Sequence, residues 1–88
     1  MPKPSDAELD VLHELLDRRH ATAEELAGRF AESHNWARST VVTFIRRLEA
    51  KGLVEHTRRA GERAFTYSPT RLAQSQPRRL LRELLDRV

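Results

Sequence analysis

Residues 36–52 carry polar side chains of the types and spacing that bind nucleic acid. Apolar residues recur here at i, i+3, i+4 and i+7, which predicts an α-helix with one buried stripe. The stripe consists of Val41, Phe44, Ile45 and Leu48. The opposite side would carry Ser39, Thr40, Thr43, Arg46, Arg47 and Ala50. Hydroxyl groups can bond base edges and arginines can pair with phosphates, so this side could enter a DNA major groove. The alternative is an ordinary solvated helix face.

Two residues at the start of this helix have different expected roles. Arg38 lies in the first turn, where the helix dipole favours an anion, so a phosphate contact suits it better than a capping role. Trp36 is expected to brace the start of the helix by packing. The chain has too few aromatic residues for Trp36 to serve as a base-stacking platform for single strands.

The histidines and nucleophiles of the chain do not form a pattern typical of catalysis or metal binding. The four histidines are scattered, and none has a His or Cys partner at i+3 or i+4. They are His13, His20, His34 and His56. The sequence contains no cysteine, which excludes thiolate ligands, disulfides and cysteine nucleophiles. We therefore expect no enzymatic activity, no catalytic or metal-ligating residues, no cofactor and no small-molecule substrate.

The charge is distributed unevenly along the 88 residues. Residues 1–37 hold four Lys/Arg and eight Asp/Glu, a net charge of −4. Residues 38–63 hold seven and three, a net charge of +4, and residues 64–88 hold five and two, a net charge of +3. The basic part is the part expected to face a polyanion. No apolar run has the length of a membrane span and no signal peptide is evident, so a soluble cytoplasmic protein without membrane contact is expected.

Two capping boxes predict the helices that precede residues 36–52. Ser5 with Glu8, and Thr22 with Glu25, have the S/T-x-x-E spacing in which two side chains satisfy free backbone N–H groups. The second helix is expected to end near Glu32, followed by a polar turn over residues 33–35. Two helices joined by such a turn predict a helix-turn-helix, with residues 36–52 as its recognition helix.

A β-hairpin is predicted after Gly52, a glycine suited to a left-handed helix end. Alternation over residues 54–58 and again over 63–68 indicates two strands, and Pro69 should end the second. The tip would carry Arg58, Arg59 and Arg63, with Phe65 and Tyr67 in the core. The fold class is therefore mainly α with a small β-hairpin, a winged helix-turn-helix over residues 1–69.

Residues 70–88 form a short C-terminal helical segment in which helix resumes after Pro77. Its apolar stripe consists of Leu80, Leu81, Leu84, Leu85 and Val88. A lone helix of about a dozen residues is marginal in water, so this segment must pack on something. We expect a dimer contact, because three helices already fill a small core. The alternative is a helix folded back on the first helix of its own chain.

In its sequence blocks the chain resembles the penicillinase-repressor (BlaI/MecI) family of bacterial transcription regulators. The matching blocks are SDAELDVLHELL at residues 5–16, ATAEELA at 21–27, WARSTVVTFIRRLEAKGLV at 36–54 and RAFTYSP at 63–69. The resemblance implies a homodimeric winged-helix repressor on a palindromic operator, with Thr40 and Thr43 touching DNA. It also implies that LLRELLDRV is similar to the start of a dimerisation region.

Two departures from the family pattern limit what the resemblance implies. Val42 stands where the family often has a longer polar residue, so base preference is not carried over. The chain ends at Val88, before the several helical turns with which the family's dimerisation region usually continues. We therefore expect only a weak homodimer, and the sequence leaves open whether release from DNA is by proteolysis.

Two functions from different classes follow from the sequence. The first is a sequence-specific regulator, a repressor, with double-stranded DNA as its partner. Bases would be contacted by Ser39, Thr40, Thr43 and Arg47, and phosphates by Arg38, Arg46, Arg58, Arg59 and Arg63. The second is a winged-helix protein-interaction module without DNA binding, because a fold does not fix a function.

Overall fold

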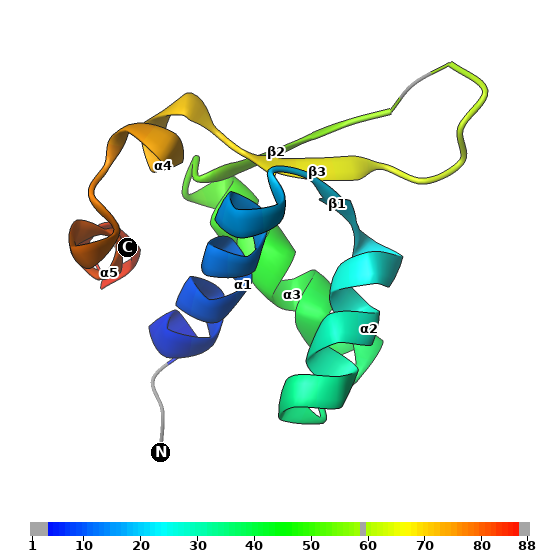
Figure 1. Ribbon diagram of the computed structural model, residues 1–88, viewed down its shortest axis with the longest axis horizontal. Helices are drawn as coiled ribbons and strands as arrows, with labels where there is room; N and C mark the ends of the chain where they lie inside the picture. Colours follow the sequence, from blue (N-terminus) through cyan, green and yellow to red (C-terminus); the bar gives the residue numbers. More distant parts are fainter. Residues whose placement is uncertain (1–3, 59, 87–88) are drawn as a thin grey trace.

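A computed structural model describes residues 4–58 and 60–86 of the chain. The helices are α1 (Pro4–Arg18), α2 (Ala23–His34), α3 (Arg38–Ala50), α4 (Arg71–Ser75) and α5 (Leu81–Asp86), with a 3-10 turn η1 (Arg78–Leu80). The strands are β1 (Ala21–Thr22), β2 (Val54–Thr57) and β3 (Thr66–Pro69). The sheet lies across one end of α1, α2 and α3, and a long loop projects from it (Figure 1). The predicted winged helix-turn-helix is confirmed.

Capping determines where α2 begins, as the sequence predicts. The Thr22 backbone N–H donates to Glu25 Oε1 at 2.9 Å, and Thr22 Oγ1 accepts from the Glu25 N–H at 3.1 Å. The bond from the Thr22 backbone, followed by that to its hydroxyl, holds the pKa of Glu25 below its ordinary value of 4.5. Because folding lowers the pKa of Glu25, the cap contributes its full stability at pH values above the ordinary pKa of 4.5. This contribution is lost as the pH falls through the lower pKa of the folded state and the carboxylate is protonated.

The second predicted capping box, at Ser5 and Glu8, is corrected by the structure. Helix α1 begins at Pro4, so Ser5 lies inside it, and Glu8 does not cap the helix. The Glu8 side chain is 2% exposed and accepts hydrogen bonds from Lys51 Nζ. Glu8 faces the interior between helices, where a cation from the end of α3 is within reach, and this pairing outweighs the local cap.

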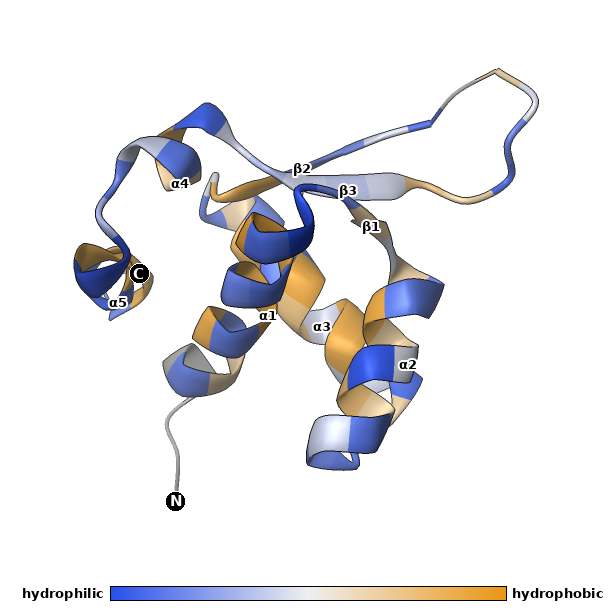
Figure 2. Ribbon diagram, in the orientation of Figure 1, coloured by the Kyte–Doolittle hydropathy of each residue, from blue (hydrophilic) through white to orange (hydrophobic). Residues whose placement is uncertain are grey.

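Helix α2 runs two residues beyond its predicted end. The Ser33 hydroxyl donates to the Arg29 carbonyl at 3.1 Å, so it supports the last turn instead of breaking it. Asn35 adopts a left-handed conformation, φ 56°, and ends the helix. The turn between α2 and α3 is therefore short. It places α3 against α1 and α2, and Val41, Ile45 and Leu48 of its apolar stripe are buried in the core. Apolar and polar segments alternate along the ribbon of α3 (Figure 2).

The two-residue strand β1 was not predicted. Ala21 and Thr22 pair with Tyr67 and Thr66 of β3, which gives an antiparallel sheet in the order β1-β3-β2. A two-residue strand has no periodicity of its own, so only its pairing partner reveals it. The pairing attaches the hairpin to the start of α2, beside the helix-turn-helix.

The paired part of the hairpin is shorter than predicted. Val54–Thr57 pairs with Thr66–Pro69, so the second strand begins at Thr66 and not at Arg63. The loop that precedes Thr66 projects away from the helices (Figure 1). We call this loop, residues 58–65, the wing; its Arg59 lies outside the described residues. The pairing of β2 with β3 ends at Thr66, the same residue at which the pairing of β1 with β3 ends.

The C-terminal segment packs on its own chain. After Pro77 the predicted single helix is divided into η1 and α5, and α5 packs against α1. Leu81 and Leu85 are 0% and 1% exposed and belong to the same core as α1, so the expectation that they face a second copy is corrected. Leu80 and Leu84 are half-buried, and Val88 lies outside the described residues. Leu81 and Leu85 pack here because the apolar surface of α1 is wider than α2 and α3 cover.

Ion pairs hold this segment near both ends of α1. Arg78 contacts Asp17 at 2.6 Å, and Arg82 contacts Asp6. Beyond Arg82 along the chain, the Leu85 carbonyl accepts from Lys51 Nζ at 3.0 Å. Lys51 also contacts both carboxylate oxygens of Glu8, at 3.1 and 3.3 Å, and thus ties the end of α3 to α1 and α5.

We expect Leu81→Ala to reduce the free energy of unfolding by about 2–5 kcal/mol, the usual cost of truncating a buried leucine. Leu72→Ala, at a leucine that is 45% exposed, is the matched control and should change stability by no more than about 0.5 kcal/mol. Urea denaturation followed by circular dichroism measures both. Unchanged stability of Leu81→Ala, together with loss of self-association in sedimentation equilibrium, would restore the dimer role of Leu81.

Lys51→Met leaves the Glu8 carboxylate buried without a cation and should cost about 3–5 kcal/mol of stability. Replacing both partners, Glu8→Leu with Lys51→Met, should recover most of that loss because no charge is then left unpaired. Arg38→Met, which breaks an exposed pair with Glu24, is the control and should cost at most about 1 kcal/mol. Equal losses for the two single methionine variants in urea denaturation would contradict a special role for Lys51.

Candidate nucleic-acid interface

The outer face of α3 is divided from its inner face as the sequence predicts. Val41, Ile45 and Leu48 are buried in the core. Residues at i, i+4, i+7 and i+11 form an exposed line along the opposite side: Ser39, Thr43, Arg46 and Ala50. Thr40, half-buried, and Arg47, exposed, flank this line. The structure therefore brings the predicted α3 side chains together on one surface.

The hydroxyl and guanidinium groups of this face are partly oriented by intramolecular contacts. Thr43 Oγ1 donates to the Ser39 carbonyl at 2.9 Å, which leaves the lone pairs of its oxygen directed outward as acceptors. The Arg47 guanidinium lies over the Phe44 ring, 5.8 Å from its centroid. The side of α3 that carries Arg47 is thus stiffened before any ligand arrives.

Aromatic packing fixes the turn that precedes α3. The half-buried Trp36 ring lies 5.1 Å from the Phe30 ring and 5.2 Å from the Phe44 ring, between centroids. His34 adds a third contact to Trp36 at 4.5 Å. The packing role predicted for Trp36 is what the structure shows. Phe44, which the sequence placed with the buried stripe, is half-buried because it contributes to this cluster at the edge of the core.

Arg38 lies in the first turn of α3, where its Nε donates to Glu24 Oε1 at 2.6 Å. The two side chains are 59% and 69% exposed. An ion pair this exposed contributes only about 0–1 kcal/mol, so a phosphate could replace Glu24 at small cost. The N-cap residue Ala37 has no side-chain acceptor, which leaves the start of α3 uncapped.

The wing supplies further arginines. Arg58 and Arg63 are exposed, and Arg59 lies outside the described residues. A shallow hollow of about 210 Å³ lies between the wing and the start of α2 and α3, and both Arg38 and Arg63 line it. The structure thus places cations from α3 and from the wing around one surface. Within residues 4–58 and 60–86, Arg46, Arg47, Arg58 and Arg63 form no ion pair.

Phe65 corrects the prediction that both hairpin aromatics are core residues. It is 43% exposed, whereas Tyr67 is half-buried against the core. Phe65 precedes the paired part of β3, where the sheet already extends beyond the helices that cover Tyr67. Alternation identified the shared face of the two residues but not where the covering helices end.

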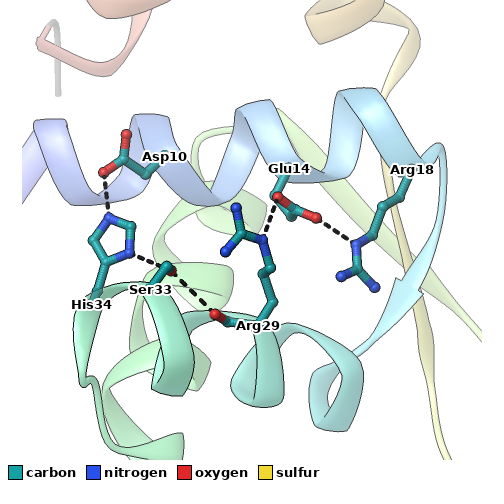
Figure 3. A network of polar contacts seen from close by, with 6 residues as sticks. All are labelled: Asp10, Glu14, Arg18, Arg29, Ser33 and His34. Atoms are coloured by element: carbon teal, nitrogen blue, oxygen red, sulfur yellow. Dashed lines mark hydrogen bonds and ion pairs between the residues drawn. The ribbon is translucent and has the colours of Figure 1, made fainter.

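The polar network between α1 and α2 has a structural role. Arg18 and Arg29 both contact Glu14, at 2.5 and 3.4 Å, and His34 Nε2 lies 3.1 Å from Asp10 (Figure 3). The contacts of Arg29 and His34 join α2 to α1, whereas Arg18 and Glu14 pair within α1. Among the described residues no group of three or more His, Cys, Asp or Glu is placed to hold a metal ion. None of the described helices is long and apolar enough to cross a membrane.

Two solved structures are similar to this chain. The solution structure of the DNA-binding domain of the repressor BlaI matches with a TM-score of 0.66 and 27% identity, covering 80% of this chain and 87% of that one. A HOP2 structure matches with a TM-score of 0.61 over 77% of this chain and 100% of that one. Its 18% identity shows a common fold only.

Sequence comparison identifies the family. The penicillinase repressor of Bacillus licheniformis is 29% identical over 69 residues, which is 78% of this chain and 52% of that protein. The chain thus spans about half the length of this curated relative. The model of the penicillinase repressor family matches residues 4–88. The resemblance found in the sequence blocks is confirmed, and the chain belongs to the penicillinase repressor family.

Proposed function

We propose that this chain is a sequence-specific transcriptional repressor that binds double-stranded DNA, with α3 in the major groove and the wing on the adjacent backbone. The observation that carries the proposal is the exposed line of Ser39, Thr43 and Arg46 on a helix whose opposite side is fully buried. Its family and its similarity to the BlaI DNA-binding domain support a DNA-binding regulator and not an enzyme.

In this proposal α3 reads bases and its flanks hold phosphates. Ser39, Thr43 and the half-buried Thr40 offer hydroxyl groups to base edges, and Arg47 offers a planar guanidinium to a guanine. Arg46 would bind a phosphate, and so would Arg38 after exchange of its Glu24 partner. Arg58, Arg59 and Arg63 would hold the backbone beside the groove.

We further propose that the operator is palindromic and is bound by two copies. A two-fold operator requires two recognition helices about 34–36 Å apart, which only a dimer sets. Leu81 and Leu85 are unavailable, so among the described residues of the predicted stripe the half-buried Leu80 and Leu84 are left for a second copy. Such a contact falls well short of the roughly 1,600 Å² of a typical stable interface, which predicts a weak dimer completed on DNA.

Thr43→Val should weaken operator binding by about 1–3 kcal/mol, because it keeps the shape of the side chain and removes its hydroxyl. The melting temperature should stay the same, since Thr43 is exposed. Thr57→Val, on the exposed strand β2, is the matched control and should bind normally. Titration of a duplex from the promoter of the protein's own gene, by mobility shift, measures both. A wild-type chain that shifts no duplex at any concentration would favour the protein-interaction module.

Arg58→Ala combined with Arg63→Ala should weaken binding to operator and random DNA alike, because phosphate contacts carry no sequence information. The slope of log Kobs against log salt should fall in magnitude by roughly 0.9 for each phosphate that the variant no longer neutralises. Arg29→Ala serves as the control, since Arg29 is engaged with Glu14 on the α1–α2 side. A double variant that loses operator binding but keeps the wild-type slope would show that the wing does not contact phosphates.

A further inference from the structure

One face of the hairpin continues outward from the core to the wing. Val54 and Pro69, which pair across β2 and β3, are buried, and the next pair on the same face is His56 with Tyr67. The alternation of strand side chains then brings Arg58 and Phe65 to this face. Its inner end is core, and its outer end is exposed.

Four side chains along this face form a continuous series of contacts from α3 to the wing. Glu49 of α3 contacts His56 Nδ1 through its carboxylate. The His56 ring lies 4.7 Å from the Phe65 ring in an edge-to-face arrangement. The Arg58 guanidinium lies over the same Phe65 ring, 5.5 Å from its centroid. We call Glu49, His56, Phe65 and Arg58 the wing row.

The wing depends on such contacts because the sheet gives it little support. Strand β1 pairs only with Thr66 and Tyr67, and the pairing of β2 with β3 ends at Thr57 and Thr66, so the described residues of the wing lie outside the ladder. A loop without ladder hydrogen bonds depends on its side-chain contacts for order. An aromatic pair adds about 0.5–1.5 kcal/mol beyond the area it buries, and an exposed cation–π contact about 0.5–1 kcal/mol. Together these contacts can hold the wing at one angle to α3.

We propose that the wing row is a positioning device, which sets the angle of the wing to α3 so that the wing arginines and α3 reach the same DNA duplex together. The inference rests on the proposed DNA binding. The wing row would favour DNA binding through preorganisation, because a wing that is already held in place loses less conformational freedom when it binds. Phe65, a large apolar side chain that is 43% exposed, then has the role of holding the His56 ring and the Arg58 guanidinium.

The first test measures order in the free protein. In Phe65→Ala, backbone ¹⁵N heteronuclear NOE values of residues 60–64 should fall, whereas Phe65→Tyr, which keeps the ring, should retain wild-type values. Thr57→Ala, on the opposite face of the hairpin, is the control for an altered strand. Thermal melts should show the same folded domain for all three variants. Unchanged NOE values in Phe65→Ala would overturn the inference.

The second test measures the consequence for DNA. Phe65→Ala removes no charged group, yet it should lower the magnitude of the salt slope by roughly 0.9 for each phosphate that the wing releases. Phe65→Tyr should restore the slope. In a background of Arg58→Ala, Arg59→Ala and Arg63→Ala, which removes all three wing arginines, Phe65→Ala should have no further effect on the slope. A wild-type slope in Phe65→Ala would overturn the inference while leaving the proposed function intact, whereas a wild-type chain that binds no duplex would refute the proposed function itself.

A third comparison tests the end of the row on α3. Glu49→Gln and Glu55→Gln each remove one negative charge near the hairpin, but only Glu49 contacts His56. Both should strengthen non-specific binding through charge. Only Glu49→Gln should also lower the NOE values of residues 60–64. Equal effects of the two variants on the NOE values would show that α3 does not position the wing.

Discussion

The arrangement of the helices depends on one buried ammonium group. Lys51, just after α3, is 13% exposed in its side chain and contacts the Glu8 carboxylate of α1 and the Leu85 carbonyl of α5. A buried charge is tolerated only when its hydrogen-bonding capacity is filled, and these acceptors fill that of Lys51. Such a pair contributes less to net stability than to geometry, because it is satisfied in one arrangement of the three helices. That arrangement directs the outer line of α3 away from the core.

The acidic and basic parts of the chain are brought together by the fold. Asp6 and Asp17 of the acidic N-terminal part contact Arg82 and Arg78 of the basic C-terminal part. Within the acidic part itself, Glu14 contacts Arg18 and Arg29. The positive charge of residues 38–63 is compensated much less, and it lies on α3 and the wing. The surface potential is thus more focused than the net charge of +3 implies, which matters for attraction to a polyanion.

Two surfaces could cover the leucines of the C-terminal segment: a second copy of the chain, or α1 of the same chain. In isolation, residues 80–88 offer an apolar stripe that a second copy could cover. In the structure, Leu81 and Leu85 already cover α1, and the ion pairs of Arg78 with Asp17 and of Arg82 with Asp6 hold them there. A second copy would have to compete with an intramolecular contact that costs no association entropy. In the proposed complex of two chains, assembly would therefore depend on the DNA more than on this segment.

Local patterns in the sequence determined the elements whose cause is local. The apolar period of residues 41–48 fixed which side of α3 is buried, and the Thr22–Glu25 spacing fixed where α2 begins. The change to a period of two located the hairpin, and the arginines that the sequence assigned to DNA lie on α3 and the wing. Their role as DNA contacts remains a prediction, since geometry shows their exposure and not their ligand.

Tertiary structure decided everything that depends on a partner distant in sequence. Strand β1 exists because β3 lies beside it, and Glu8 binds Lys51 instead of capping α1 because the end of α3 brings a cation within reach. Leu81 and Leu85 are core residues because α1 has a second apolar side to cover. Phe65 is exposed because it lies in the part of the hairpin that extends beyond the helices packed against the sheet. In each case the side chain has two chemically acceptable environments, and which one it occupies depends on which distant surface the fold places beside it.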